Sequence, residues 1–134
     1  MTDMPDARDI AARWLSKAAN DLLAATHTLG LGAECPYDIV CFHCQQCVEK
    51  CLKGVLASAG SDPPRTHDIR ALVRLVPVPV TLPLTEDEQD LLSDYAVTVR
   101  YPSDDDETTR EDAETATVMA RRVYEAVRAR LAVD

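Results

Sequence analysis

The sequence of 134 residues lacks a long apolar run and is poor in glycine and aromatic residues. No run approaches the roughly 18 apolar residues of a membrane span, so we expect no membrane association. The N-terminus is acidic and has no apolar segment typical of a secretory signal, which favours a cytoplasmic location. Only four glycines and one phenylalanine accompany abundant Ala, Leu and Arg. This composition and length predict one helical domain spanning residues 1–134.

Basic residues are also scarce, with 14 Lys and Arg against 23 Asp and Glu, for a formal net charge of −9. The acidic excess is concentrated in residues 84–115, which contain twelve acids but only Arg100 and Arg110 as bases. Non-specific binding to DNA or to an anionic membrane needs a basic surface, so this balance disfavours both. A small local site for a nucleotide remains compatible with it.

Apolar residues recur at steps of three and four along most of the chain, which is typical of amphipathic helices. In the first helix this stripe is Ile10, Trp14, Ala18, Leu22, Ala25 and Leu29. The pattern predicts helices near residues 6–30, 36–59, 66–76, 85–100 and 108–131. It therefore predicts an all-α fold, an up-and-down four-helix bundle with an additional short helix, five helices in total.

Capping residues set the expected helix ends. Gly30 and Gly60 stop the first two helices, and Thr66 is the expected N-cap of the third. Capping boxes are predicted at residues 85–88 and 108–111. The inward stripe expected for the fourth helix is Leu91, Leu92, Tyr95 and Val99.

Four of the five cysteines lie in the segment CFHCQQCVEKC, residues 41–51, with the C-x2-C-x2-C-x3-C spacing found in bacterial ferredoxins. On a helix this segment spans about 15 Å, whereas the ligands of one metal need sulfur atoms within roughly 4 Å of each other. We therefore interpret the cysteines as small apolar core residues and expect no metal and no cofactor. A zinc or iron–sulfur site and a Cys44–Cys47 redox pair are the alternatives.

A polar stripe lies roughly opposite the cysteines on the same predicted helix. It consists of His43, Gln46, Lys50 and Lys53, spaced by three, four and three residues. Two ammonium groups, an amide and an imidazole can hold a phosphate or a base edge. The alternative is an ordinary solvated face.

Four segments together resemble the HEPN domain family (higher eukaryotes and prokaryotes nucleotide-binding). They are WLSKAANDLLAA, CFHCQQCVEKCLKGVL, RTHDIRALV and YAVTVRYP, at residues 14–25, 41–56, 65–73 and 95–102. The resemblance implies a five-helix bundle that is often dimeric. Many such domains are encoded beside a minimal nucleotidyltransferase, and several are the ribonuclease toxin of such a toxin–antitoxin pair.

Ribonuclease members of this family use an Arg-x4–6-His motif, in which arginine steadies the phosphate and histidine transfers a proton. Arg100 fits the arginine position, but Asp105, Asp106 and Glu107 stand where the histidine would be. No histidine follows His67 in the sequence. We therefore assign no catalytic residue.

The resemblance leaves three functional hypotheses. The first is a non-catalytic homodimeric module that binds a nucleotide, an RNA or a small nucleotidyltransferase. Its candidate binding residues are His43, Gln46, Lys50, Lys53, Arg100 and Tyr101. The second is a diverged metal-independent endoribonuclease that uses Arg100 with His43 or His67. The third is a purely structural dimerisation bundle.

Overall fold

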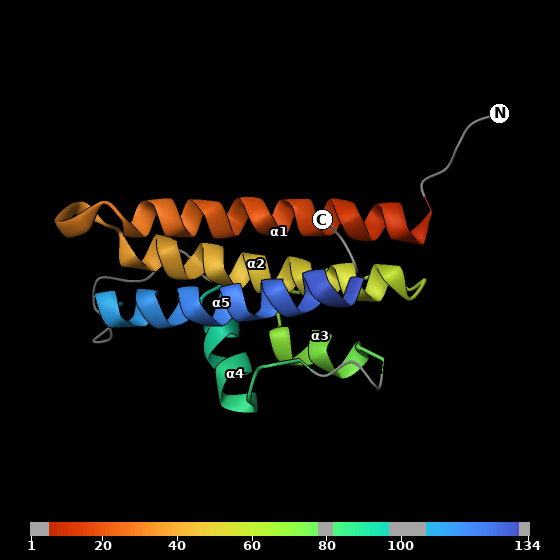
Figure 1. The fold of residues 1–134 in the computed structure, drawn as a ribbon. Coiled ribbons are helices and arrows are strands. Elements are labelled where there is room, and N and C mark those ends of the chain that lie inside the picture. The colour runs from red at the N-terminus through yellow and green to blue at the C-terminus, as the bar shows by residue number, and fades with distance from the viewer. Residues whose placement is uncertain (1–5, 78–81, 97–106, 132–134) are drawn as a thin grey trace.

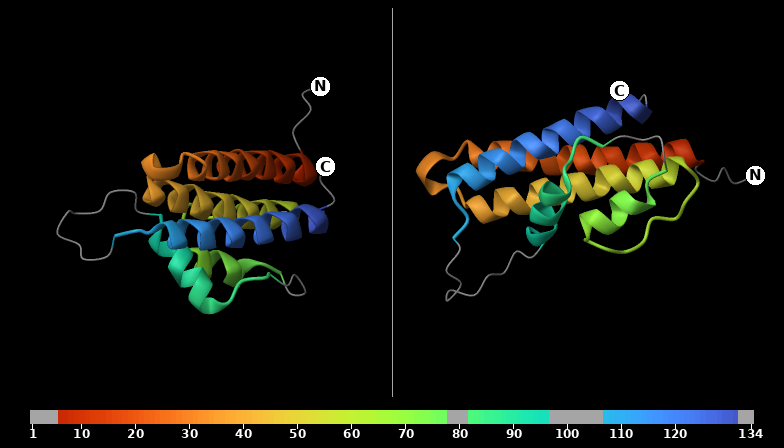
Figure 2. Two further views of the ribbon diagram at one scale, coloured as in Figure 1. Left: turned by 60° about the vertical axis from the view of Figure 1, so that its left-hand side comes forward. Right: turned by 90° about the horizontal axis from the view of Figure 1, so that it is seen from below.

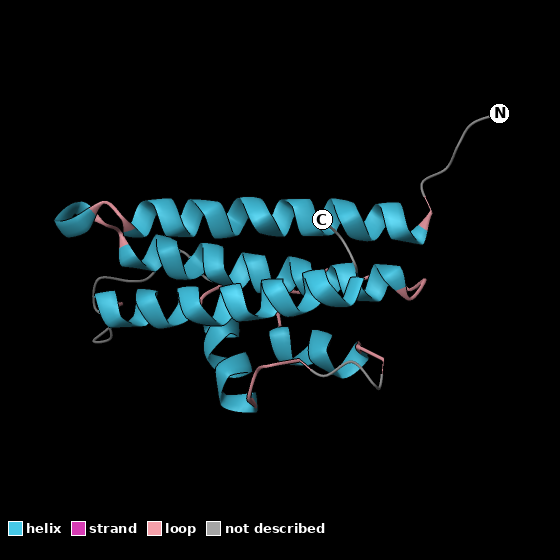
Figure 3. Cartoon of the chain, viewed as in Figure 1, coloured by secondary structure: helices cyan, strands magenta, loops and turns pink. Residues whose placement is uncertain are grey.

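The computed structural model describes residues 6–77, 82–96 and 107–131. These residues form five α-helices and one short 3₁₀ turn at Gly32–Glu34, and they contain no strand (Figure 3). The helices are α1 (Ala7–Leu29), α2 (Tyr37–Ser58), α3 (Ile69–Leu75), α4 (Glu86–Asp94) and α5 (Arg110–Leu131). The all-α class predicted from the apolar periodicity is confirmed.

The three long helices lie side by side, and α1 runs antiparallel to α2 and α5 (Figure 1). The short helices α3 and α4 pack on each other and on α2, on the side of the molecule away from α1 (Figure 2). Two short helices therefore fill the fourth position of the bundle, where a longer fourth helix was expected.

Helix α2 is the central element of the fold. Fourteen of its 22 residues are buried, because α1, α5 and the α3–α4 pair pack against different sides of it. Small residues of α1 and α5 allow close packing, as at Ala18 and Ala25 of α1 and Ala116 and Ala120 of α5, all of which are fully buried. Residues of the polar stripe on α2 are consequently less exposed than the sequence predicted.

All five cysteines are free of disulfide bonds and buried, which confirms their interpretation as core residues. The Cys44 thiol lies 3.6 Å from the Thr117 hydroxyl of α5. Burial raises the pKa of this thiol to about 12, although the hydrogen bond to Thr117 opposes the shift. In the described part of the chain, no group of three or more His, Cys, Asp or Glu side chains is arranged to hold a metal ion.

Helix ends follow local hydrogen bonding. Asp6 caps α1 by accepting the backbone N–H of Asp9 at 2.9 Å. At the end of α2, Gly60 has a φ of +82°, and its N–H and that of the next residue bond back to the last helical turn. This is a Schellman arrangement, which glycine favours. The predicted capping box between Thr85 and Glu88 is confirmed.

Two predicted caps were wrong in detail. Asp68, not Thr66, caps α3 by accepting the N–H of Ala71, because the Thr66 hydroxyl accepts the N–H of Asp68 instead. The box that opens α5 joins Thr109 and Asp112, one residue later than predicted, and each side chain accepts the other's backbone N–H.

The predicted extent of α4 was also wrong. The helix ends at Asp94, and Tyr95 is its C-cap, with its ring buried in the core. Since the helix is short and packs through Leu92 and Tyr95, Leu91 is 40% exposed rather than inward-facing. Val99 lies outside the described residues.

Helices α1 and α2 approach each other closely at Gly54. A Cβ atom at this position would lie 3.4 Å from Trp14 Cβ and 3.5 Å from the Ala11 carbonyl oxygen. The two helices can therefore bring polar side chains of α1 directly onto α2. No helix in the described ranges is long and apolar enough to cross a membrane.

Candidate functional site

The first part of the site is formed where Asp21 of α1 meets two residues of the predicted stripe on α2. His43 Nδ1 lies 2.9 Å from Asp21 Oδ1, and Lys50 Nζ lies 2.5 Å from Asp21 Oδ2. The side chains of His43 and Lys50 are 30% and 23% exposed, and that of Asp21 is 11% exposed. Two donors two helical turns apart thus converge on one carboxylate and remain accessible.

The second part is centred on Glu49, whose side chain is only 5% exposed. Its Oε2 accepts from Lys53 Nζ at 3.0 Å, and its Oε1 lies 2.7 Å from His67 Nδ1. Gln45 Nε2 donates to the same Oε1 at 3.2 Å. Each buried carboxylate is therefore bonded to one lysine and one histidine.

Gln45 connects Gln46 of the stripe to the second part of the site. Gln46 Nε2 donates to Gln45 Oε1 at 2.7 Å, and Gln45 Nε2 donates to the His67 carbonyl oxygen at 3.0 Å. The chain before α3 is thereby fixed to α2. Gln46 is half-buried and lies between His43 and Lys50 in the sequence of α2.

Lys53 has little access to solvent. Its side chain is 9% exposed, and its ammonium group lies 5.6 Å from the Trp14 ring centroid, in cation–π contact. Because Glu49 and Trp14 surround this ammonium group, Lys53 is held as part of the packing between α1 and α2.

The predicted cationic stripe is nearly charge-balanced in the fold. Two lysines oppose two carboxylates, so the cluster has no net charge when both histidines are neutral. Protonation of His43 and His67 makes it positive. The accessible part of this charge lies on His43, His67 and Lys50, since Lys53 is buried.

Arg100 and Tyr101 lie outside the described residues, as do Asp105 and Asp106. Their convergence with the α2 stripe stays a prediction. His27, the remaining histidine, is exposed near the end of α1.

Sequence reasoning missed the acceptors Asp21, Gln45 and Glu49. Asp21 stands within the first quoted motif, and Glu49 precedes Lys53 by four residues, the spacing of a helical ion pair. These signals were present, but the partner of Asp21 depends on how α1 is placed against α2.

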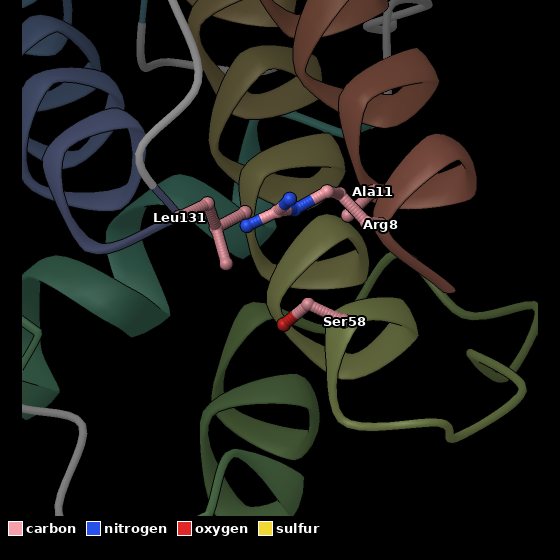
Figure 4. Close-up of a pocket in the computed structure, with 4 residues that line it drawn as sticks. All are labelled: Arg8, Ala11, Ser58 and Leu131. Atoms are coloured by element: carbon pink, nitrogen blue, oxygen red, sulfur yellow. The ribbon is translucent and has the colours of Figure 1, made fainter. Parts of the chain in front are cut away.

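A separate small cavity lies at one end of the bundle, lined by Arg8, Ala11, Ser58 and Leu131 (Figure 4). Its volume is about 150 Å³, whereas pockets for drug-sized ligands span about 300–1,000 Å³. It contains none of the predicted site residues. The cavity is thus too small for a nucleotide and is distinct from the polar cluster.

Comparison with known proteins places these features in a family. The sequence model of the HEPN domain matches residues 11–130, from the first turns of α1 to the end of α5. The chain belongs to the HEPN domain family. This HEPN family is nucleotide- and RNA-related. No curated protein gave a significant match to the chain.

Two solved structures are similar to this HEPN domain. TT1696 from Thermus thermophilus is 31% identical with a TM-score of 0.75, and the match covers 89% of this chain and 96% of TT1696. ST0689, an archaeal HEPN homologue, is 23% identical with a TM-score of 0.62, and the match covers 96% and 99% of the two chains. The second likeness supports the fold alone.

Proposed function

We propose that this HEPN domain is a non-catalytic module that binds a phosphate-bearing ligand, a nucleotide or RNA, at His43 and Lys50. The observation that carries the proposal is the convergence of these two donors on Asp21 while both remain partly exposed. Two donors aimed at one carboxylate are also suitably placed for the oxygens of a phosphate, which prefers charge-assisted hydrogen bonds.

Electrostatic screening supports such a site on an acidic protein. The Debye length is about 8–10 Å at physiological ionic strength, so distant acids have little effect on a ligand at the cluster. Gln46 would add an amide at the edge of the site, and Arg100 and Tyr101 are proposed further contacts. Lys53 would contribute indirectly, by fixing Glu49 and Trp14.

The proposed protein partner is a small nucleotidyltransferase, in a toxin–antitoxin-like pair, and the proposed assembly is a homodimer. Both rest on the family resemblance. Apolar side chains such as Leu23 and Val118, which are 69% and 59% exposed, are compatible with a protein partner. Co-purification with a nucleotidyltransferase encoded beside the gene, followed by light scattering, tests both proposals.

Calorimetric titration with ATP and with a short RNA tests the binding site. Binding should weaken with salt and fall by about tenfold or more in Lys50→Ala, as expected for loss of a charged contact. Lys17→Ala is the matched control, because Lys17 is an exposed lysine of α1 outside the site. An equal loss of affinity in both variants, with folding intact, would show that only the overall charge of the protein matters. That result would contradict a binding site at Lys50.

The geometry of His43 supports one alternative function, a diverged endoribonuclease. A carboxylate at Nδ1 orients the ring and leaves Nε2 available for proton transfer, as in other base–orienter pairs. His67 has the same relation to Glu49. RNA cleavage lost in Arg100→Ala and in one of the two histidine variants would replace the non-catalytic proposal. Neither binding nor cleavage, with or without a partner, would leave a structural dimerisation bundle.

A further inference from the structure

Asp21 is bound in the way that a ligand anion would be. It is 8% exposed, and each of its two oxygens meets a different donor, Oδ1 with His43 and Oδ2 with Lys50. The donors belong to α2 and the acceptor belongs to α1. The position of the Asp21 carboxylate is therefore set by the packing of α1 against α2. The partly exposed donors His43 and Lys50 are therefore already hydrogen-bonded to Asp21 when no ligand is bound.

We propose that Asp21 is an internal competitor for the His43–Lys50 site, and that the site consequently selects a dianionic terminal phosphate over a phosphodiester. The inference rests on the proposed function, because it concerns the same two donors. It identifies the ligand class as a nucleotide with a free terminal phosphate rather than the interior of an RNA chain.

The selectivity follows from a comparison of charges. A phosphodiester carries one negative charge, as Asp21 does, but it must also lose translational and rotational freedom to bind. A terminal phosphate carries about −1.5 to −2 charges near pH 7 and has three acceptor oxygens. Only the second ligand gains enough over Asp21 to draw Lys50 and His43 toward itself.

Access separates Asp21 from the other carboxylate on this face. Lys50 and His43 are 23% and 30% exposed, so a phosphate can reach them from solvent. Lys53 and Glu49 are 9% and 5% exposed, and Trp14 covers the ammonium group. Glu49 is accordingly a reference carboxylate: it also meets a lysine and a histidine, but its lysine is closed to solvent and only His67, 70% exposed, is accessible.

The experiment titrates AMP, and an RNA dinucleotide without terminal phosphate, into the wild-type chain and into Asp21→Asn and Asp9→Asn. We expect Asp21→Asn to bind AMP about tenfold more tightly or better, since a competing negative charge has been removed. The same variant should gain affinity for the dinucleotide, and so lose selectivity. Asp9→Asn should leave the affinity for AMP unchanged, because Asp9 is an exposed residue in the first turn of α1 outside the site. Asp21→Asn combined with Lys50→Ala should lose the gain.

A measurement on the wild-type chain covers the case in which Asp21→Asn fails to fold. Saturation with AMP should shift the carboxyl ¹³C resonance of Asp21 and leave that of Glu49 in place.

Each outcome separates this inference from the proposed function. If the wild type binds AMP but Asp21→Asn binds no more tightly, or the Asp21 resonance does not move, internal competition is wrong and the binding site stands. If Asp21→Asn binds AMP and the wild type does not, competition is supported. The proposed function, in which the wild-type chain itself binds a phosphate, is then overturned. If neither folded protein binds AMP, both are wrong. Tighter binding of the dinucleotide than of AMP by the wild type would refute the selectivity.

Discussion

Lys53 and Glu49 form an ion pair within α2 that is nearly closed to solvent, with 3.0 Å between Nζ and Oε2. Lys50, one turn earlier on a neighbouring face, pairs instead with Asp21 at a more exposed position. The two lysines are adjacent in the predicted stripe, but the fold gives them different roles. One stabilises packing, whereas the other remains accessible to a ligand.

Replacement of these lysines should separate the two roles. Lys53→Met leaves Glu49 buried without its cation and should lower the free energy of unfolding by about 3 kcal/mol. Lys50→Met breaks a partly exposed pair and should cost about 1 kcal/mol or less. Urea denaturation measures both changes. Equal costs would contradict the assignment of Lys53 to the packing.

The buried thiols should make the fold sensitive to alkaline pH. Burial raises the pKa of Cys44 from 9.0 to about 12, and a hydrogen bond with Cys47, followed by burial, raises the pKa of Cys51. The stabilisation is fully present below the unfolded pKa of 9.0. It is lost as pH rises toward the folded value, because only the unfolded chain then releases the proton.

The expected slope above pH 9 is about 1.4 kcal/mol per pH unit for each such thiol. Urea denaturation between pH 7 and pH 11 measures it, and Cys44→Ala should reduce the slope. In the native state at neutral pH, alkylation of Cys44 should proceed only through unfolding. Rapid alkylation without unfolding would show that the thiol is accessible.

Substitution by alanine should have opposite effects on stability at Gly54, within α2, and at Gly60, just after its end. Gly54→Ala places Cβ at ordinary contact distance, 3.4 Å from Trp14 Cβ, so the gain in helix propensity should stabilise the fold by up to about 1 kcal/mol. Gly60→Ala forces a side chain to adopt a φ of +82° and should destabilise it by about 1–2 kcal/mol. Thermal melting distinguishes the two signs. A destabilising Gly54→Ala would show that α1 and α2 cannot yield at this contact.

The capping box of α4 should contribute stability that depends on acid pH. Hydrogen bonding to the Thr85 N–H, together with contacts to Arg122, holds the pKa of Glu88 below its usual value. Its contribution is therefore present above the unfolded pKa of 4.5 and disappears as pH falls through the folded pKa. The stability difference between wild type and Glu88→Gln, measured with urea, should be clear at pH 7 and absent at pH 2. A constant difference would contradict this.

The long helices were predictable because apolar residues recur along each of them at steps of three and four. In α5 the apolar residues Ala113, Ala116, Ala120, Val123 and Val127 are all buried, whereas Leu131 is partly buried and Ile10 of the predicted stripe in α1 is 37% exposed. The cysteines could be interpreted from geometry alone, because a straight helix cannot gather four sulfur atoms. The extent of α4 was less predictable, since tertiary packing of a short element decides where it ends.

The candidate site was only partly predictable for a related reason. A helical pattern shows that His43, Gln46, Lys50 and Lys53 share a face, but it does not show what covers that face. Asp21 comes from another helix, and so does Trp14, which lies against the Lys53 ammonium group. Arg100 and Tyr101 lie beyond the ranges that the structure describes, so their part in the site stays a prediction.

The connection between α1 and α2 has a consequence for the order of folding. Only residues 30–36 separate the two helices, so their pairing costs little loop-closure entropy, whereas α5 must dock from far along the chain. We expect α1 and α2 to associate in the transition state and α5 to add later. Leu22→Ala should then slow folding, while Val123→Ala should mainly accelerate unfolding, in stopped-flow measurements. Asp21 would reach His43 and Lys50 before the last helix is in place.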